Sequence, residues 1–286
     1  MELIRGKDVA AAMTEKVAAE VQRLQEAGHR TPVLAIVRIG ERPEDLAYER
    51  GANTRMKKCG ITVESHVFPE DVAEETFLKA WEEINARETV DGILLFMPLP
   101  KQIDTGKVIA KMDPAKDMDG ITTINQGKIF RGEKDGYAPC TAEAVMETLH
   151  FAGIDVKGLE TVVVGRSNVI GKPVSMLLLS EHATVTICHT RTKDLQAELK
   201  RADLVVACAG VAEMIDGSMI KEGAIVMDVG INGRADGSIC GDVKTESLEG
   251  IAALATPVPG GIGSVTTSVL ADHVLRAFCA GQSDNR

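Results

Sequence analysis

Residues 161–173 read TVVVGRSNVIGKP, and this stretch decides the fold of the second half of the chain. The valines at 162–164 form a short apolar run, which is typical of a buried parallel strand. Gly165 ends the run, and the apolar segment at 174–179 predicts a helix. A strand, a glycine turn and a helix form the first half of a dinucleotide-binding unit, in which the helix N-terminus faces a phosphate. The spacing is not G-x-G-x-x-G, so the local pattern leaves a phosphate site and plain packing equally open.

Further apolar runs toward the C-terminus extend this unit. They predict strands at 184–188, 204–207 and 224–229 and a last helix at 269–279. His189, Gly210 and Gly230 follow the predicted strands, as Gly165 follows the first one. Ligands of open α/β sheets bind at the carboxyl ends of the strands. We therefore expect these residues to converge on one crevice.

The N-terminal half shows the same alternation. Predicted helices at 8–27, 46–58 and 74–86 alternate with predicted strands at 33–37, 61–68 and 91–97. This rhythm predicts a second α/β domain with a parallel sheet and helical crossovers. The polar segment 113–137 is predicted to be a long irregular loop, which is often functional. A helix at 141–152, with Thr141 as its N-cap, marks the expected domain boundary.

Composition excludes several classes of function. The chain has 286 residues, enough for two domains, and a net charge of −10. This charge argues against nucleic-acid and membrane-surface partners, which require a basic surface. No apolar run approaches the roughly 20 residues that span a bilayer. The six cysteines form no C-x-x-C pair, which predicts reduced thiols in a cytoplasmic protein and no metal site.

The residues after the predicted strand 184–188 bear on the choice of nucleotide. An NAD site usually places a carboxylate there, on the ribose hydroxyls, but the chain continues as His189-Thr190-Arg191. Arg166 and Arg191 are placed to flank a 2′-phosphate, which guanidinium groups bind well. This favours NADP over NAD. The alternative is that both arginines are solvated surface charges.

Several motifs together resemble the methylenetetrahydrofolate dehydrogenase/cyclohydrolase family. They are VVVGRSNVIGKP, TPVPGGIG at 256–263, KDMDGI at 116–121 and PLP at 98–100, in the family's order over nearly the whole chain. The resemblance implies an N-terminal folate-binding domain (1–140 with 269–286), a C-terminal Rossmann-like NAD(P)-binding domain (141–268) and a cleft between them. It also implies a homodimer that oxidises 5,10-methylenetetrahydrofolate to the methenyl form in one-carbon metabolism. Most members then hydrolyse the product to 10-formyltetrahydrofolate.

The resemblance assigns site residues position by position. Tyr48 and Asp119 match the family's substrate tyrosine and pterin-binding aspartate, and both are assigned as catalytic. A carboxylate suits the pterin because it accepts two N–H bonds from the aminopyrimidinone edge. The substrate-binding set is Tyr48, Pro98, Leu99, Pro100, Asp119, Gly260, Gly261 and Gly263. The cofactor-binding set is Gly165, Arg166, Ser167, Gly171, His189, Thr190, Gly210 and Ile231, to which the argument for a 2′-phosphate adds Arg191.

Two positions depart from the family pattern. Ala52 stands at the lysine of the YxxxK motif, and Phe96 at the glutamine of the VQLPLP motif. In the family, these two residues and the tyrosine carry the hydrolytic half-reaction. Neither replacement can transfer a proton, whereas hydride transfer requires mainly positioning. We therefore predict a dehydrogenase with weak or absent cyclohydrolase activity. The alternatives are a bifunctional enzyme and a non-catalytic folate- or nucleotide-binding module.

Overall fold

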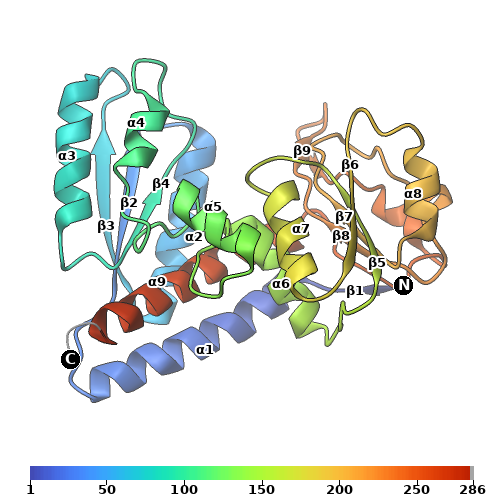
Figure 1. Ribbon diagram of the computed structural model, residues 1–286, viewed down its shortest axis with the longest axis horizontal. Coiled ribbons are helices and arrows are strands. Elements are labelled where there is room, and N and C mark those ends of the chain that lie inside the picture. The colour runs from blue at the N-terminus through green and yellow to red at the C-terminus, as the bar shows by residue number, and fades with distance from the viewer. Residues whose placement is uncertain (284–286) are drawn as a thin grey trace. The chain divides into compact units, whose positions relative to one another are not determined.

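The computed structural model describes residues 1–283, whose contacts divide the chain into two compact units (Figure 1). The six-stranded unit, named after its sheet, contains Met1–Ala11, Ile129–Lys134 and Thr141–Thr266. The three-stranded unit contains Ala12–Lys128, Asp135–Cys140 and the chain from Thr267 onward. Both main sheets are parallel and connected through helices, which confirms the predicted α/β class.

The main sheet of the six-stranded unit has the strand order β1-β11-β8-β7-β5-β6. Its strands are β1 (Glu2–Leu3), β5 (Glu160–Val164), β6 (Thr184–Cys188), β7 (Leu204–Ala207), β8 (Ile225–Asp228) and β11 (Leu254–Ala255). Helices α6 (Cys140–Phe151), α7 (Gly171–Ser180) and α8 (Leu195–Arg201) and the hairpin of β9 (Asn232–Gly233) and β10 (Ile239–Cys240) complete it. The prediction of β5–β8, α6 and α7 is confirmed, whereas β1, β9–β11 and α8 were not predicted.

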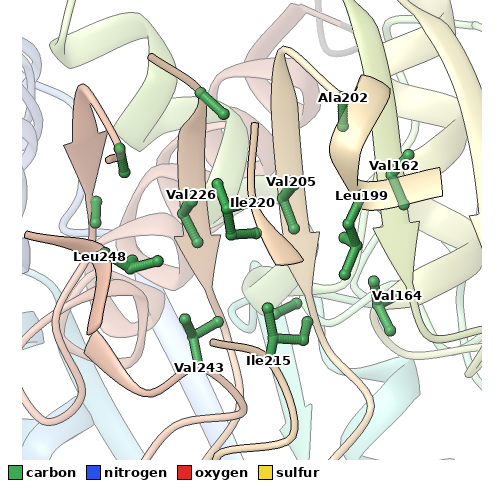
Figure 2. Close-up of a cluster of buried hydrophobic side chains, with 14 of the residues drawn as sticks. Val162, Val164, Leu199, Ala202, Val205, Ile215, Ile220, Val226, Val243 and Leu248 are labelled. Carbon is green, nitrogen blue, oxygen red and sulfur yellow. The ribbon is translucent and has the colours of Figure 1, made fainter. Parts of the chain in front are cut away.

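The core of this unit explains the valine run in its sequence. Val162, Val205 and Val226 occupy paired positions on β5, β7 and β8, and all three are fully buried. Figure 2 shows them in a row, with side chains such as Leu199 and Ile220 packed beside them. Since β6 pairs with one edge of β5 and β7 with the other, the strand order reverses at β5. The carboxyl ends of β5 and β7 are therefore the switch point at which such sheets bind ligands.

His150 links α6 to the end of α7 and supports a prediction about pH. Its ring lies between Glu147, with Nδ1 3.8 Å from Oε1, and Glu181, with Nε2 2.9 Å from Oε1. The neighbouring carboxylates of Glu147 and Glu181 raise the pKa of His150 from 6.5 to about 9. The stabilisation is complete below the ordinary pKa and is lost as the pH rises through about 9. We expect the melting temperature of the wild type to exceed that of His150→Ala at pH 6 and to converge with it by pH 10.

The expected difference is small, because all three side chains are more than a third exposed. Thermal unfolding of both proteins across this pH range measures it. A difference that did not change with pH would contradict the assignment of the charge to His150.

The three-stranded unit contains β2 (Val33–Ile39), β3 (Thr62–Phe68) and β4 (Gly92–Leu95), in the order β3-β2-β4. Its helices are α2 (Pro43–Cys59), α3 (Glu74–Ala86), α4 (Thr105–Ala110) and α9 (Thr266–Ser283). Phe77 and Trp81 of α3 are fully buried against one face of the sheet, and Trp81 Nε1 donates to the Val108 carbonyl. Helices α1 (Gly6–Glu26) and α5 (Thr123–Arg131) each contain residues of both units.

Two predictions of local structure were wrong. The segment 113–137 contains α5 and is not an irregular loop throughout. Its polar sequence hid the helix, whose start is fixed by side chains: Thr122 Oγ1 accepts from the Asn125 N–H. Thr141 lies inside α6 and is not its N-cap. The Cys140 N–H at that end of α6 donates instead to a distant carboxylate, that of Asp119.

None of the helices within residues 1–283 has the length and apolar character required to cross a membrane.

Candidate active site

Helix α2 carries Tyr48, the first of the predicted substrate residues. The half-buried Tyr48 ring meets the Phe96 ring edge-on, with centroids 5.9 Å apart and planes at 81°. Phe96 follows β4, and its N–H donates to the carbonyl of Val37 on β2. Ala52 lies one turn beyond Tyr48 and is 0% exposed. The two positions that depart from the family pattern therefore give this region buried, apolar side chains.

A buried ion pair joins β2 to α2 at the residue next to Tyr48. The sequence did not predict it. Arg38 Nε on β2 donates to Glu49 Oε2 at 2.7 Å, and Ser65 Oγ on β3 donates to Glu49 Oε1 at 2.7 Å. Arg38 also donates to the carbonyl of Gly40. Arg38 and Glu49 are both buried. This network fixes the start of α2 to the sheet at the residue that follows Tyr48.

The KDMDGI motif runs alongside β4. Met118 N–H donates to the carbonyl of Ile93, and Asp117 forms an isolated parallel bridge with that residue. The Asp117 side chain is fully buried and accepts from the N–H groups of Ile121 and Thr122 at 3.0 and 2.8 Å. Asp117 thus holds the turn that follows it. Sequence reasoning assigned it no role, although it is the first acid of the motif.

Asp119 is the second acid of this motif. Its Oδ1 accepts from the Cys140 N–H at 2.8 Å, which orients the carboxylate. Burial raises the pKa of Asp119, and the hydrogen bond from Cys140 opposes the rise. The motif thus supplies two carboxylates with different roles. Asp117 holds the turn, and Asp119 is oriented and half-buried. An oriented carboxylate of this kind can recognise a pair of N–H donors.

A cavity of about 570 Å³ opens at the carboxyl ends of β2, β3 and β4. Pro98, Leu99 and Pro100 line it, as the loop after β2 does with Gly40 and Arg42. The predicted PLP segment therefore forms a cavity wall. This edge of a parallel sheet is where ligands of α/β domains bind.

The turn after β5 contains four of the predicted cofactor residues and is tightly packed. Gly165 has a φ of +142°, and a Cβ there would lie 2.4 Å from the carbonyl oxygen of Cys208. A Cβ on Gly171 would lie 2.4 Å from the carbonyl oxygen of Gly165. Only glycine permits this close approach of the turn to β7 and to the start of α7. Ser167 Oγ accepts from the Ile170 N–H at 3.1 Å, and Arg166 and Ser167 are exposed.

The turn after β6 presents Arg191. Its N–H donates to Nδ1 of His189 at 3.1 Å, and the His189 N–H donates to Thr192 Oγ1 at 2.9 Å. Thr190 and Arg191 are exposed on this ordered turn. The guanidinium of Arg191 is therefore available to an anionic ligand at the carboxyl edge of the sheet.

The remaining predicted residues follow β7, β8 and β11. Gly210, in the loop after β7, adopts a left-handed φ of +69°. Ile231 is 67% exposed after β8, and a Cβ on Gly263 would lie 3.5 Å from its Cδ1. Gly260, Gly261 and Gly263 belong to the six-stranded unit, as all the predicted cofactor residues do, whereas Tyr48, Asp119 and the PLP segment belong to the three-stranded unit.

Two further carboxylates at this edge were not predicted. Asp228 and Asp242 are almost completely buried and accept backbone N–H groups from the loops that carry Gly210 and Gly230. Burial raises the pKa of Asp228 to about 6. Asp228 lies in the segment MDVGIN and Asp242 in the segment GDV. In each case the sequence shows only an aspartate among small or apolar residues.

Comparisons with known proteins match both parts of the chain. The family model for the tetrahydrofolate dehydrogenase/cyclohydrolase catalytic domain matches residues 4–119, and that for the NAD(P)-binding domain matches residues 139–282. "Bifunctional protein FolD" of Clostridioides difficile is 46% identical over 96% of each chain.

Two solved structures are similar over nearly their whole length. The bifunctional FolD enzyme of Campylobacter jejuni has a TM-score of 0.94 and 34% identity, covering 98% of this chain and 99% of that one. The dehydrogenase-cyclohydrolase (FolD) of Trypanosoma brucei, complexed with NADP cofactor and inhibitor, has a TM-score of 0.91 and 34% identity, covering 99% and 98%.

Proposed function

Because this chain belongs to the tetrahydrofolate dehydrogenase/cyclohydrolase family, we propose that it oxidises 5,10-methylenetetrahydrofolate to 5,10-methenyltetrahydrofolate with NADP. The observation that carries the proposal is Asp119, an oriented and half-buried carboxylate in the family's own motif. Its free acceptor capacity suits the N–H edge of a pterin. Tyr48 and the PLP segment supply the remaining contacts to the folate.

The residues of the six-stranded unit fit the cofactor. Gly165 and Gly171 permit a tight turn between β5 and α7, of the kind that approaches the pyrophosphate in other dinucleotide sites. When bound, NADP accepts a hydride from the methylene carbon, while a substrate nitrogen donates its lone pair to that carbon. The protein's part is to hold the two reactants in register and to exclude water. Buried Ala52 and Phe96 are compatible with that task.

Hydrolysis of the methenyl product is the second candidate activity. The names of the relatives favour the bifunctional alternative over the loss of cyclohydrolase activity that Ala52 and Phe96 predict. If the bifunctional alternative holds, hydrolysis proceeds without an ionisable group at position 52. Tyr48, four residues before position 52 on α2, is then the candidate polar group for hydrolysis.

An absorbance assay with methylenetetrahydrofolate tests both activities. It should follow reduced cofactor and methenyltetrahydrofolate together, with NADP and separately with NAD. Reduced cofactor without accumulation of methenyl product would establish the bifunctional enzyme. Accumulation of methenyl product in step with reduced cofactor would mean that hydrolysis is weak or absent. If reduced cofactor did not form, the non-catalytic binding module would replace the proposed function.

Arg191 is expected to determine the preference for NADP. Replacement by serine removes a guanidinium from the turn after β6, and we expect the KM for NADP to rise about tenfold or more with little change in the KM for NAD. Lys221→Ser is the matched control, because Lys221 pairs with Asp203 at the other end of the sheet. Steady-state kinetics with both cofactors measure the effect. Equal changes for NADP and NAD would exclude a role in recognising the 2′-phosphate.

We also propose that the protein is a cytoplasmic homodimer. The proposed domain limits are those implied by the resemblance: 1–140 with 269–286 for the folate-binding domain and 141–268 for the NAD(P)-binding domain. Residues 284–286 of the first domain lie outside the described residues.

A further inference from the structure

The loop after β7 gives three consecutive backbone N–H groups to a single carboxylate. Ala209 and Gly210 donate to Asp242 Oδ2 at 2.5 and 2.9 Å, and Val211 donates to Oδ1 at 2.9 Å. The Asn232 side chain adds a fourth donor, to Oδ1 at 2.9 Å. Successive N–H groups of this kind form a cradle that commonly binds phosphate. Here a residue of the chain itself fills the cradle.

Asp242 is held from the other side by Asp228. The Asp242 N–H donates to Asp228 Oδ1 at 3.0 Å, and the Gly230 N–H donates to the same oxygen at 3.0 Å. The two buried acids thus connect the loops after β7 and β8 with the segment 240–243. Among the ion pairs of residues 1–283, none involves Asp228 or Asp242. The cradle therefore carries negative charge, which disfavours a phosphate there.

The direction of the N–H groups sets the direction of the carbonyl groups. In a trans peptide the C=O of one residue points opposite to the N–H of the next. The Ala209 N–H points to Asp242, and the carbonyl oxygen of Cys208, in the same peptide, lies 2.4 Å from the position that a Cβ of Gly165 would take. The loop therefore turns a hydrogen-bond acceptor toward the β5 turn, at the switch point of the sheet.

We propose that Asp242 is a positioning residue for the nicotinamide riboside half of the cofactor, because it keeps phosphate out of the 209–211 cradle and turns the carbonyl groups of this loop toward hydroxyl and amide donors. The phosphates are then left to the turns after β5 and β6. This inference rests on the proposed function, since it assumes a nicotinamide dinucleotide in the crevice.

Asp242→Asn tests the proposal. Each oxygen of Asp242 accepts two donors, so an amide would face at least two N–H groups with its own NH2. We expect the dissociation constant of NADP to rise at least about tenfold. The affinity for adenosine 2′,5′-bisphosphate, which lacks the nicotinamide riboside half, should change less than about twofold. Calorimetric titration measures both.

Asp203→Asn is the matched control. Asp203 also accepts a backbone N–H, from Glu160, but at the opposite end of the sheet. It should leave both affinities unchanged. Equal losses of both ligands in Asp242→Asn, or no loss of either, would overturn the proposal. Failure of the wild type to bind NADP would instead overturn the proposed function and this inference with it.

Hydrogen exchange of the wild type keeps the proposal testable if Asp242→Asn does not fold. The amides of residues 209–211 should be protected in the free protein and should not gain protection when NADP or the bisphosphate binds. Amides that exchange freely and become protected only with a phosphate ligand would mean that the cradle serves the ligand, contrary to the proposal.

Discussion

Replacing Asp119 with asparagine is expected to lower kcat/KM for methylenetetrahydrofolate by about 100-fold or more, with NADP affinity unchanged. An amide retains one oxygen, which can still accept from the Cys140 N–H. The other position changes from an acceptor to a donor and opposes the N–H edge of the pterin. The fall in kcat/KM thus has two causes: a charge-assisted hydrogen bond is missing, and N–H donors of the pterin are left without an acceptor.

Steady-state kinetics and NADP titration of the same preparation separate the two ligands. Asp113→Asn is the control, because Asp113 lies in the same loop and accepts from the Ala115 N–H without belonging to the proposed site. The role given to Asp119 would be wrong if Asp119→Asn retained near-normal kcat/KM. It would also be wrong if NADP affinity fell in parallel, because the fault would then not be confined to the folate site.

Replacing Arg38 with methionine is expected to lower the free energy of unfolding by about 3–5 kcal/mol. The substitution removes the guanidinium but leaves the Glu49 carboxylate buried between β2 and α2, with Ser65 as its remaining donor. A buried charge without a partner destabilises the folded protein by far more than the ion pair stabilises it. Urea denaturation followed by circular dichroism measures the change.

The double variant Arg38→Met with Glu49→Leu should recover most of this loss, since it replaces the pair with apolar side chains of similar volume. It also separates stability from catalysis, because Glu49 is the neighbour of Tyr48 on α2. A folded double variant with impaired turnover would show that the pair positions Tyr48. If Arg38→Met alone cost less than about 1 kcal/mol, the pair would behave like an exposed one.

The strands that could be predicted are those that a continuous run of apolar residues marks in the sequence. β5 and β7 match their predicted ranges closely, because strands buried on both faces need continuous apolar residues. β1 and β11 contain two residues each, too few for any pattern, and long-range pairing alone makes them strands. α5 escaped prediction because its sequence, TINQGKIFR, is too polar to show a helical apolar pattern, and a hydrogen bond to the Thr122 side chain marks its start.

Some site residues could likewise be predicted from the sequence, and others could not. Motifs indicated Asp119 and the glycine turns, because close approach and ligand contact restrict the residue type. They did not reveal Asp117, which accepts N–H groups of its own turn. Nor did they reveal Asp228 and Asp242, which accept N–H groups from segments that only the folded chain brings together. Nor did they reveal the Arg38–Glu49 pair, since charged residues in a strand and a helix are normally read as solvent-facing.

The pairing of β1 with β11 has a consequence for the order of events during synthesis. Glu2 aligns with Leu254, so β1 has no neighbour in the sheet until β11, far along the chain, has been synthesised. Helix α9 places a similar demand on the three-stranded unit, since it comes from the last part of the chain. Contacts so distant in sequence slow folding. A nascent chain halted at the boundary near residue 140 would therefore leave both units incomplete.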